Sequence, residues 1–258
     1  MEINLNSDLG EKSKYHSGVN DNLLLEIVNT ANIACGYHAG STETMHKTIK
    51  DAKFKDVSIG AHPGFNDRKN FGRKRINLSK NELKKLIREQ LELFKKISTL
   101  ENYPFTHVKP HGALNNMACE NLEISLIIGN EIKEFNKELI FVVLPLSKME
   151  IAAQKNNLKY ACEIFCDRNY EDDGSLMSRD KKNALIYDPK ACANNTLEMI
   201  ESSSIKCFSG KKIYCSSIDT VCVHGDSKSS ILIAKELQKI IKMNNIPTKK
   251  LNELKKFI

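Results

Sequence analysis

The sequence predicts an α/β fold of the single-domain (β/α)-barrel kind. Short apolar runs alternate with longer amphipathic segments along all 258 residues. This alternation is typical of parallel strands that are joined by crossover helices. No Gly/Ser-rich linker divides the chain, so we expect residues 1–258 to form one domain. An open, doubly wound sheet is the alternative arrangement of the same elements.

Seven apolar runs are the candidate strands of the barrel. They cover residues 2–8, 31–37, 57–62, 105–111, 139–145, 159–167 and 219–225. A complete barrel of this class has eight strands. We therefore expect a seven-stranded, distorted barrel.

Three helices have clear signals at their ends. In the first, over 80–98, Ser79 and Glu82 stand at the spacing of a capping box. The second begins at Pro189, because proline is favoured at the first helical position and an acidic cap precedes it. The third covers 227–244 and is stopped by a proline shortly after its end.

The bulk composition indicates a soluble globular protein, with 41% hydrophobic and 28% charged residues. The net charge of +7 comes from lysines on the predicted helices, a pattern typical of solvated helix faces rather than of a nucleic-acid site. The longest apolar run, LIFVVLPL at 139–146, is far too short to span a bilayer, and the N-terminus lacks a signal-peptide pattern. We expect a cytoplasmic protein without nucleic-acid or membrane partners, and a homo-oligomer is compatible with the sequence.

The eight cysteines form no CxxC pair, which favours free thiols in a reducing compartment. Cys35 and Cys222 fall inside strand-like runs. We expect both to be small apolar packing residues.

Polar side chains recur on one face of the predicted strands. The stretch HVKPHGALNN places His107, Lys109 and His111 at alternate positions, and therefore on one face of a strand. Ionisable residues also stand at the carboxyl ends of six predicted strands: Asp8, His38, His62, His111, Asp167 and His224. Barrel enzymes build their sites at that end. Six such strand ends together therefore predict an active site.

Eight motifs resemble segments of the LamB/YcsF family. They are NSDLGE (6–11), TANIACGYHAG (30–40), IGAHPGF (59–65), FGRK (71–74), HVKPHGAL (107–114), EIFCDRNY (163–170), DGSLMSR (173–179) and VCVHGD (221–226). The resemblance implies a (β/α) barrel related to glycoside hydrolase and deacetylase barrels. It also implies the A component of an ATP-dependent 5-oxoprolinase, which opens 5-oxo-L-proline to L-glutamate with the B and C subunits, and with ATP and Mg²⁺ as co-substrate.

The expected chemistry assigns roles to these residues. A lactam amide is unreactive, but phosphorylation of its oxygen would create a leaving group that water can displace with the help of a base. We expect Asp8, His38, His62 and His111 to transfer protons or position water. We expect Lys109 to stabilise developing negative charge. The other candidate residues of the site are expected to bind the substrate. They are Glu11, Asn32, Arg73, Glu163, Asp167, Arg168, Arg179, His224 and Asp226.

Among the arginines, Arg168 or Arg179 is expected to hold the substrate carboxylate. His107 lies deeper in its strand and is expected to be a hydrogen-bonded support. No GxxxxGK[ST] motif is present in the sequence, so ATP is not bound by a P-loop of this chain. This agrees with a need for partner subunits in the activation step.

Two other functions remain open at this point. The first is a metal-dependent amide hydrolase or deacetylase, with Asp8, His38, His62 and His224 as ligands. No HExxH motif or close histidine pair supports such a site from the sequence alone. The second is a non-catalytic subunit that holds a small acid or sugar for its partners.

Overall fold

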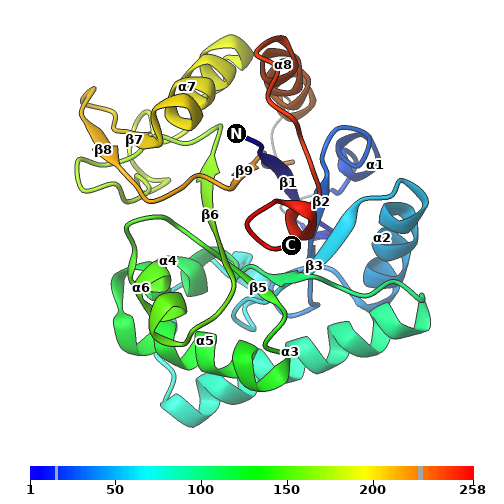
Figure 1. Cartoon of the computed structure of the whole chain (residues 1–258). Helices are drawn as coiled ribbons and strands as arrows, with labels where there is room; N and C mark the ends of the chain where they lie inside the picture. The colour runs from blue at the N-terminus through cyan, green and yellow to red at the C-terminus, as the bar shows by residue number, and fades with distance from the viewer. Residues whose placement is uncertain (15–16, 226–228) are drawn as a thin grey trace.

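The computed structural model describes residues 1–14, 17–225 and 229–258 (Figure 1). Within these ranges, seven parallel strands close into a barrel in the order β1-β2-β3-β4-β5-β6-β9. The strands are β1 (Asn4–Leu9), β2 (Thr30–Ala34), β3 (Ser58–His62), β4 (His107–Val108), β5 (Ile140–Val143), β6 (Tyr160–Phe165) and β9 (Thr220–Cys222). All seven predicted strands are confirmed, and the alternative of an open doubly wound sheet is wrong.

Helices surround the barrel, as Figure 1 shows. They are α1 (Asp21–Leu24), α2 (Thr42–Phe54), α3 (Lys80–Leu100), α4 (Gly112–Glu120), α5 (Leu122–Phe135), α6 (Lys148–Lys155), α7 (Pro189–Ser202) and α8 (Ser230–Met243), with short 3-10 helices η1 (Arg68–Asn70) and η2 (Leu251–Glu253). The predicted helices correspond to α3, α7 and α8. The capping box of α3 is confirmed, because Ser79 and Glu82 exchange side-chain to backbone hydrogen bonds. The predicted start of the third helix at 227 lies outside the described residues.

A small hairpin outside the barrel was not predicted from the sequence. Strands β7 (Ser204–Lys206) and β8 (Lys212–Tyr214) pair antiparallel between α7 and β9. Each has only three residues, which is too short for an alternation of apolar and polar positions to be recognised.

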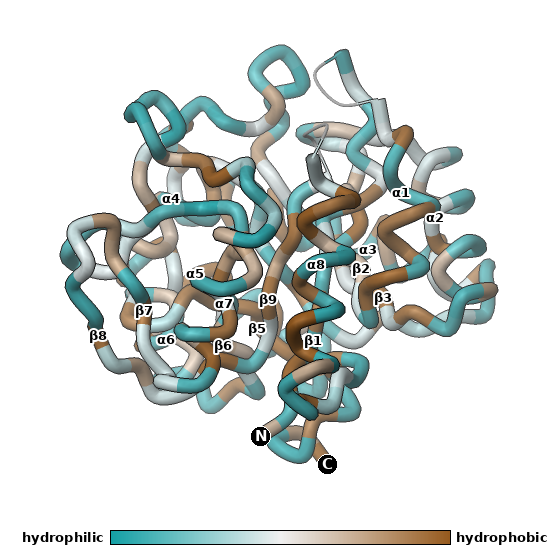
Figure 2. Tube along the Cα trace, turned by 90° about the horizontal axis from the view of Figure 1, so that it is seen from above, coloured by the Kyte–Doolittle hydropathy of each residue, from teal (hydrophilic) through white to brown (hydrophobic). Residues whose placement is uncertain are grey.

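The apolar core lies between the strands and the surrounding helices. The strand residues Leu5, Ile33, Ile59 and Val108 point their side chains outward from the barrel. They pack in one large buried cluster with the inner faces of the helices. In Figure 2 the apolar stretches run along the strands and the adjoining part of α8, while the outer loops are mostly hydrophilic. None of the described helices is both long and apolar enough to cross a membrane.

Much of the barrel interior is polar, whereas branched apolar residues fill most such barrels, and its apolar side chains are confined to small clusters such as that of Leu144, Phe165 and Cys222. At its amino end, Asn4 bonds Thr30 and Thr220, and Thr30 bonds Ser58, with all distances at 2.7–2.9 Å. These side chains satisfy one another, which removes most of the cost of burying them. This layer of hydrogen-bonded side chains lies at the amino end of the barrel, and the ionisable groups lie above it at the carboxyl ends of the strands.

Gly60 on β3 makes room for a large interior side chain. A Cβ at this position would lie 2.2 Å from the ring of His107 on the neighbouring strand β4. Glycine is therefore needed here so that the imidazole can lie across the barrel.

Candidate active site

A cavity of about 610 Å³ opens at the carboxyl ends of the strands. Its walls come from the strand ends and from the loops that follow them. Residues selected from the sequence that line it are Asp8, Glu11, His62, Arg73, Lys109, His111, Arg168, Arg179 and His224. The volume is within the range of about 300–1,000 Å³ that is usual for small-molecule sites.

Lys109 lies between two buried carboxylates. Its Nζ is 2.8 Å from Asp8 Oδ1 and 2.9 Å from Glu163 Oε1. Burial would lower the pKa of Lys109, but the charge of Asp8 and other neighbours raises that pKa well above its usual value. Burial likewise would raise the pKa of Asp8, but electrostatic interaction with His62 and with the Lys109 ammonium holds that pKa below its usual value. At neutral pH the pair is therefore an ammonium and a carboxylate.

A layer of hydrogen bonds beneath the cavity fixes Asp8. Asn32 Nδ2 donates to Asp8 Oδ1 at 2.8 Å and to Asn6 Oδ1 at 2.7 Å. His107 Nε2 donates to Asn32 Oδ1 at 2.8 Å, and burial lowers the pKa of His107 to about 3, so its ring is neutral. The expected supporting role of His107 agrees with these contacts.

Two residues that the sequence assigns to substrate binding lie in this deeper layer. Asn32 and Glu163 are each about 1% exposed and are not among the described residues that line the cavity. Both point into the barrel as the alternation predicts, but they stand one interior layer below the strand ends. They contact Asp8 and Lys109 rather than the cavity.

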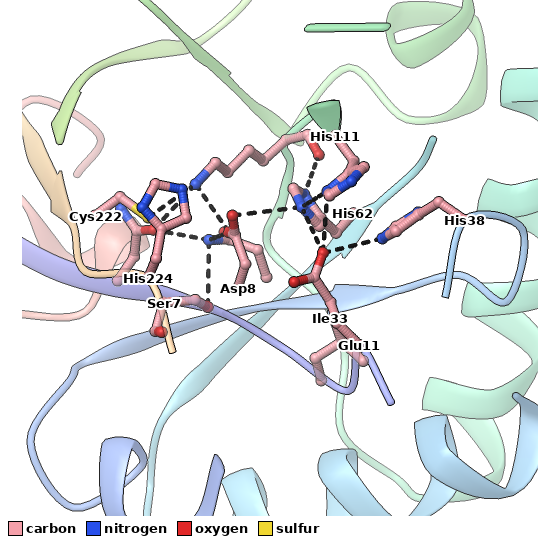
Figure 3. A network of polar contacts seen from close by, with 12 residues as sticks. Ser7, Asp8, Glu11, Ile33, His38, His62, His111, Cys222 and His224 are labelled. Carbon is pink, nitrogen blue, oxygen red and sulfur yellow. Dashed lines mark hydrogen bonds and ion pairs between the residues drawn. The ribbon is translucent and has the colours of Figure 1, made fainter. Parts of the chain in front are cut away.

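Three histidines gather around the carboxylate of Glu11 (Figure 3). Glu11 Oε1 is 3.0 Å from His111 Nδ1, 3.1 Å from His38 Nε2 and 3.6 Å from His62 Nε2. Burial would raise the pKa of Glu11, but His111 and its neighbours hold that pKa well below its usual value. Burial lowers the pKa of His38 to about 3 and that of His62 to about 4.

His38 lies behind His111 rather than at the cavity surface. The two rings stack with their centroids 3.8 Å apart, and His38 is fully buried and not among the described lining residues. Its expected direct part in catalysis is therefore corrected, because the ring of His111 stands between it and a ligand in the cavity.

Gly72, in the FGRK motif, permits this stacking. It has a φ of +62°, and a Cβ there would approach His38 Cβ to 2.7 Å and His111 Cδ2 to 3.0 Å. Any side chain at this position would therefore be strained and would also push the two rings apart.

On the opposite side of Asp8, His224 bonds Asp167. His224 Nδ1 lies 2.9 Å from both carboxylate oxygens of Asp167, and its ring stacks on Phe165. Burial would raise the pKa of Asp167, but His224 lowers it. Asp167 thus orients His224 along the cavity wall, while Asp226 lies outside the described residues.

Arg168 is committed to the loop above the cavity. Its guanidinium donates to the backbone carbonyls of Met177 and Ala184, and burial lowers its pKa to about 10. Of the two arginines expected to hold a substrate carboxylate, Arg168 therefore has fewer donors left to offer, and Arg179 also lines the cavity. Arg73 also lines the cavity and lies over the ring of Phe71.

Cys222 packs in a small buried apolar cluster with Leu144 and Phe165, as expected, but it also makes a polar contact. Lys109 Nζ donates to its Sγ at 3.2 Å, so the sulfur takes part in the polar group around Asp8. Burial raises the pKa of the Cys222 thiol well above its usual value. The sequence contained a signal for this polar contact, because Cys222 lies on the same alternating face of its strand as His224. Cys35 is buried in the outer apolar cluster, as expected.

Among the described residues, two groups bring potential metal ligands together. One comprises Glu11, His38, His62 and His111, and the other Asp8, Cys222 and His224. The predicted ligand set of Asp8, His38, His62 and His224 is therefore divided between the groups. The reason is visible in Figure 3, where His38 and His224 stand on opposite sides of Asp8 and His62.

These features define a class of protein: a seven-stranded (β/α) barrel with a polar interior and an ionised site at the carboxyl ends of its strands. The solved structure of T48 deacetylase with substrate shares the fold, with a TM-score of 0.52 at 13% identity over 97% of this chain and 88% of that one. The Lactam Utilization Protein from Thermus thermophilus is much more similar, with a TM-score of 0.88 at 31% identity, over 96% of this chain and 99% of that one.

The sequence comparisons lead to the family. A protein of Nitrobacter hamburgensis that is named as the A component of 5-oxoprolinase is 42% identical over 247 residues, which cover 95% of this chain and 96% of that protein. The model of the LamB/YcsF family matches residues 3–256. The chain belongs to the LamB/YcsF family.

Proposed function

We propose that this chain is the A component of an ATP-dependent 5-oxoprolinase, which hydrolyses 5-oxo-L-proline to L-glutamate together with the B and C subunits. One observation carries the proposal: the Lys109 ammonium is fixed 2.8 Å from the Asp8 carboxylate on the wall of a cavity that suits a small molecule. The similarity to a protein named as the A component of 5-oxoprolinase supports the choice of substrate.

The pair can divide the chemistry of amide hydrolysis between its members. Asp8 would accept a proton from the attacking water, and neighbouring His62 and His111 would help to position that water. Lys109 would stabilise negative charge as it develops on the lactam oxygen. Arg179 and Arg73 would hold the substrate carboxylate, because arginine can bond a carboxylate through two parallel hydrogen bonds.

ATP, with Mg²⁺, would supply the energy for opening the ring. Phosphorylation of the lactam oxygen would make the ring carbon electrophilic. After water adds to that carbon, the C–N bond would break with the ring nitrogen leaving as the amine, and a second water would hydrolyse the resulting acyl phosphate to the carboxylate and phosphate. Since the sequence contains no P-loop motif, we assign this activation step to the complex with the partner subunits rather than to this chain alone.

Reconstitution tests the proposal. The chain is mixed with candidate B and C subunits, and glutamate release from 5-oxoproline is followed with and without ATP. We expect ATP-dependent release by the mixture and none by the chain alone. Release by the purified chain with ATP would refute the division of labour, and no release by any mixture that forms a complex would refute the function.

A metal-dependent amide hydrolase is the second candidate, because Glu11 and three histidines converge beside Asp8. ATP dependence separates the two functions. Hydrolysis of a simple amide or an N-acetyl sugar by the chain alone, without ATP and abolished by a chelator, would favour this second candidate.

A further inference from the structure

The group formed by Glu11, His38, His62 and His111 brings a carboxylate and three imidazole rings together (Figure 3). Nδ1 of His62 lies 2.7 Å from the backbone oxygen of Lys109, and Nε2 of His111 lies 2.9 Å from the backbone oxygen of Phe71. A carbonyl oxygen can only accept, so each of these outer nitrogens carries the hydrogen.

The inner nitrogens of neutral rings must then present lone pairs. His62 Nε2 and His111 Nδ1 are 3.0 Å apart, and both face Glu11 Oε1 at 3.6 and 3.0 Å. Among these three atoms there is no hydrogen to share when both rings are neutral. Acceptors at such distances repel one another unless a proton or a metal ion lies between them, and one ion can serve all three atoms at once.

The spacing of the atoms fits a metal ion. Metal–nitrogen bonds of about 2.0–2.1 Å in a tetrahedral site place neighbouring ligand atoms roughly 3.3 Å apart. The three separations among Glu11 Oε1, His62 Nε2 and His111 Nδ1 run from 3.0 to 3.6 Å. The backbone carbonyls behind His62 and His111 are the outer partners that metal-binding histidines normally have.

We propose that Glu11, His62 and His111 bind one divalent transition-metal ion such as Zn²⁺, with His38 as a supporting residue behind them. Two imidazoles and one carboxylate, with a fourth position left for water, suit zinc and similar ions, whereas Mg²⁺ and Ca²⁺ prefer oxygen ligands. His38 lies outside the ligand set because its ring is stacked parallel to that of His111, so the in-plane lone pairs of the two rings cannot meet at one ion. Its Nε2 instead lies 3.1 Å from Glu11 Oε1 and helps to position that carboxylate.

The second group of potential ligands carries no such proposal. Lys109 Nζ already bonds both Asp8 and Cys222 there, and this ammonium supplies the positive charge that an ion would bring. A bound ion at the first group would leave Asp8 as the proton acceptor and would make His62 and His111 ligands rather than proton carriers.

Metal binding is measured on the isolated chain, without lactam, ATP or partners. The protein is stripped with a chelator and dialysed, and then titrated with Zn²⁺ by calorimetry and with Co²⁺ by visible absorption. We expect one ion per chain, the spectrum of four-coordinate Co²⁺, and a melting temperature that rises with added Zn²⁺.

The variants test the assignment of ligands. Glu11→Gln, His62→Gln and His111→Gln are expected to lose stoichiometric binding, and His38→Gln to weaken it by about 10- to 100-fold, the loss typical of a supporting residue. The matched control is His46→Gln, which breaks another histidine–glutamate pair, with Glu101 at 2.6 Å. It is expected to bind as the unchanged chain does.

If the folded, unsubstituted chain binds less than one ion per chain, the proposal is overturned, whatever the variants do. Full binding by folded His62→Gln and His111→Gln chains, or lost binding in the control, would overturn it too. Because no activity is measured, failure of the reconstituted complex to release glutamate would not affect this result.

Discussion

At the scale of single residues, Lys109 is the charge on which the site depends. It is 3% exposed and is bonded to Asp8 and Glu163, which are also buried. Burying three charged groups is unfavourable unless each is paired. The ammonium therefore stabilises the barrel interior and at the same time presents positive charge to the cavity.

Lys109→Met should lower the free energy of unfolding by about 3–5 kcal/mol, because it leaves two buried carboxyl groups without their counter-charge. Urea denaturation followed by circular dichroism measures this loss. The double variant Lys109→Met/Glu163→Gln should lose less, since one of the unpaired charges is also removed. A single variant as stable as the unchanged chain would contradict the pairing.

Asp8→Asn should lower kcat of the reconstituted complex by about 10²- to 10⁴-fold, which is the usual contribution of a general base. The KM for 5-oxoproline should change little, because the amide keeps the size of the carboxylate. Steady-state kinetics separates the two constants, and Asp51→Asn on the outer face of α2 is the control. A weaker affinity with unchanged kcat would instead indicate a subunit that only binds.

At the scale of elements, the pairing of β3 with β4 determines the shape of the polar interior. Gly60 stands opposite His107 in the register, and the imidazole occupies the space that a side chain on Gly60 would need. From there His107 reaches Asn32 on β2. One glycine on one strand therefore allows a hydrogen-bond chain across three strands, and that chain ends at Asp8.

Gly60→Ala should destabilise the fold by about 1–3 kcal/mol, the usual loss from overpacking. Combining it with His107→Ala should cost less than the sum of the two single changes, because the second substitution removes the ring with which the new methyl group collides. Urea denaturation of the four proteins gives the coupling. Additive losses would show that the two residues do not compete for space.

At the scale of the whole molecule, the two ends of the barrel have different tasks. Loops at the carboxyl ends build the cavity, while the C-terminal segment covers the other end and is drawn in red over the barrel centre in Figure 1. Leu251 and Leu254 pack there against Ile140, Val142 and Ala161. The polar interior is thereby closed at its amino end by an apolar contact.

Leu251→Ala should lower the free energy of unfolding by about 2–5 kcal/mol. Leu251 is only 1% exposed, so truncating its side chain leaves a buried cavity. Zn²⁺ binding and assembly with partner subunits should persist below the melting temperature, because the site lies at the other end. Leu100→Ala, at a position 62% exposed, is the control and should change stability little. Equal losses in both variants would contradict the covering role.

By itself the sequence determined the seven strands, three of the helices and the face on which each polar residue of a strand lies. These are local properties, because side-chain direction follows the period of the strand. Only the tertiary structure decided which strand ends meet. It placed His38 behind His111, directed Arg168 to the carbonyls of a loop, and joined Cys222 to Lys109. These contacts depend on how the barrel closes and how the loops fold over it, and no spacing along a single strand contains that information.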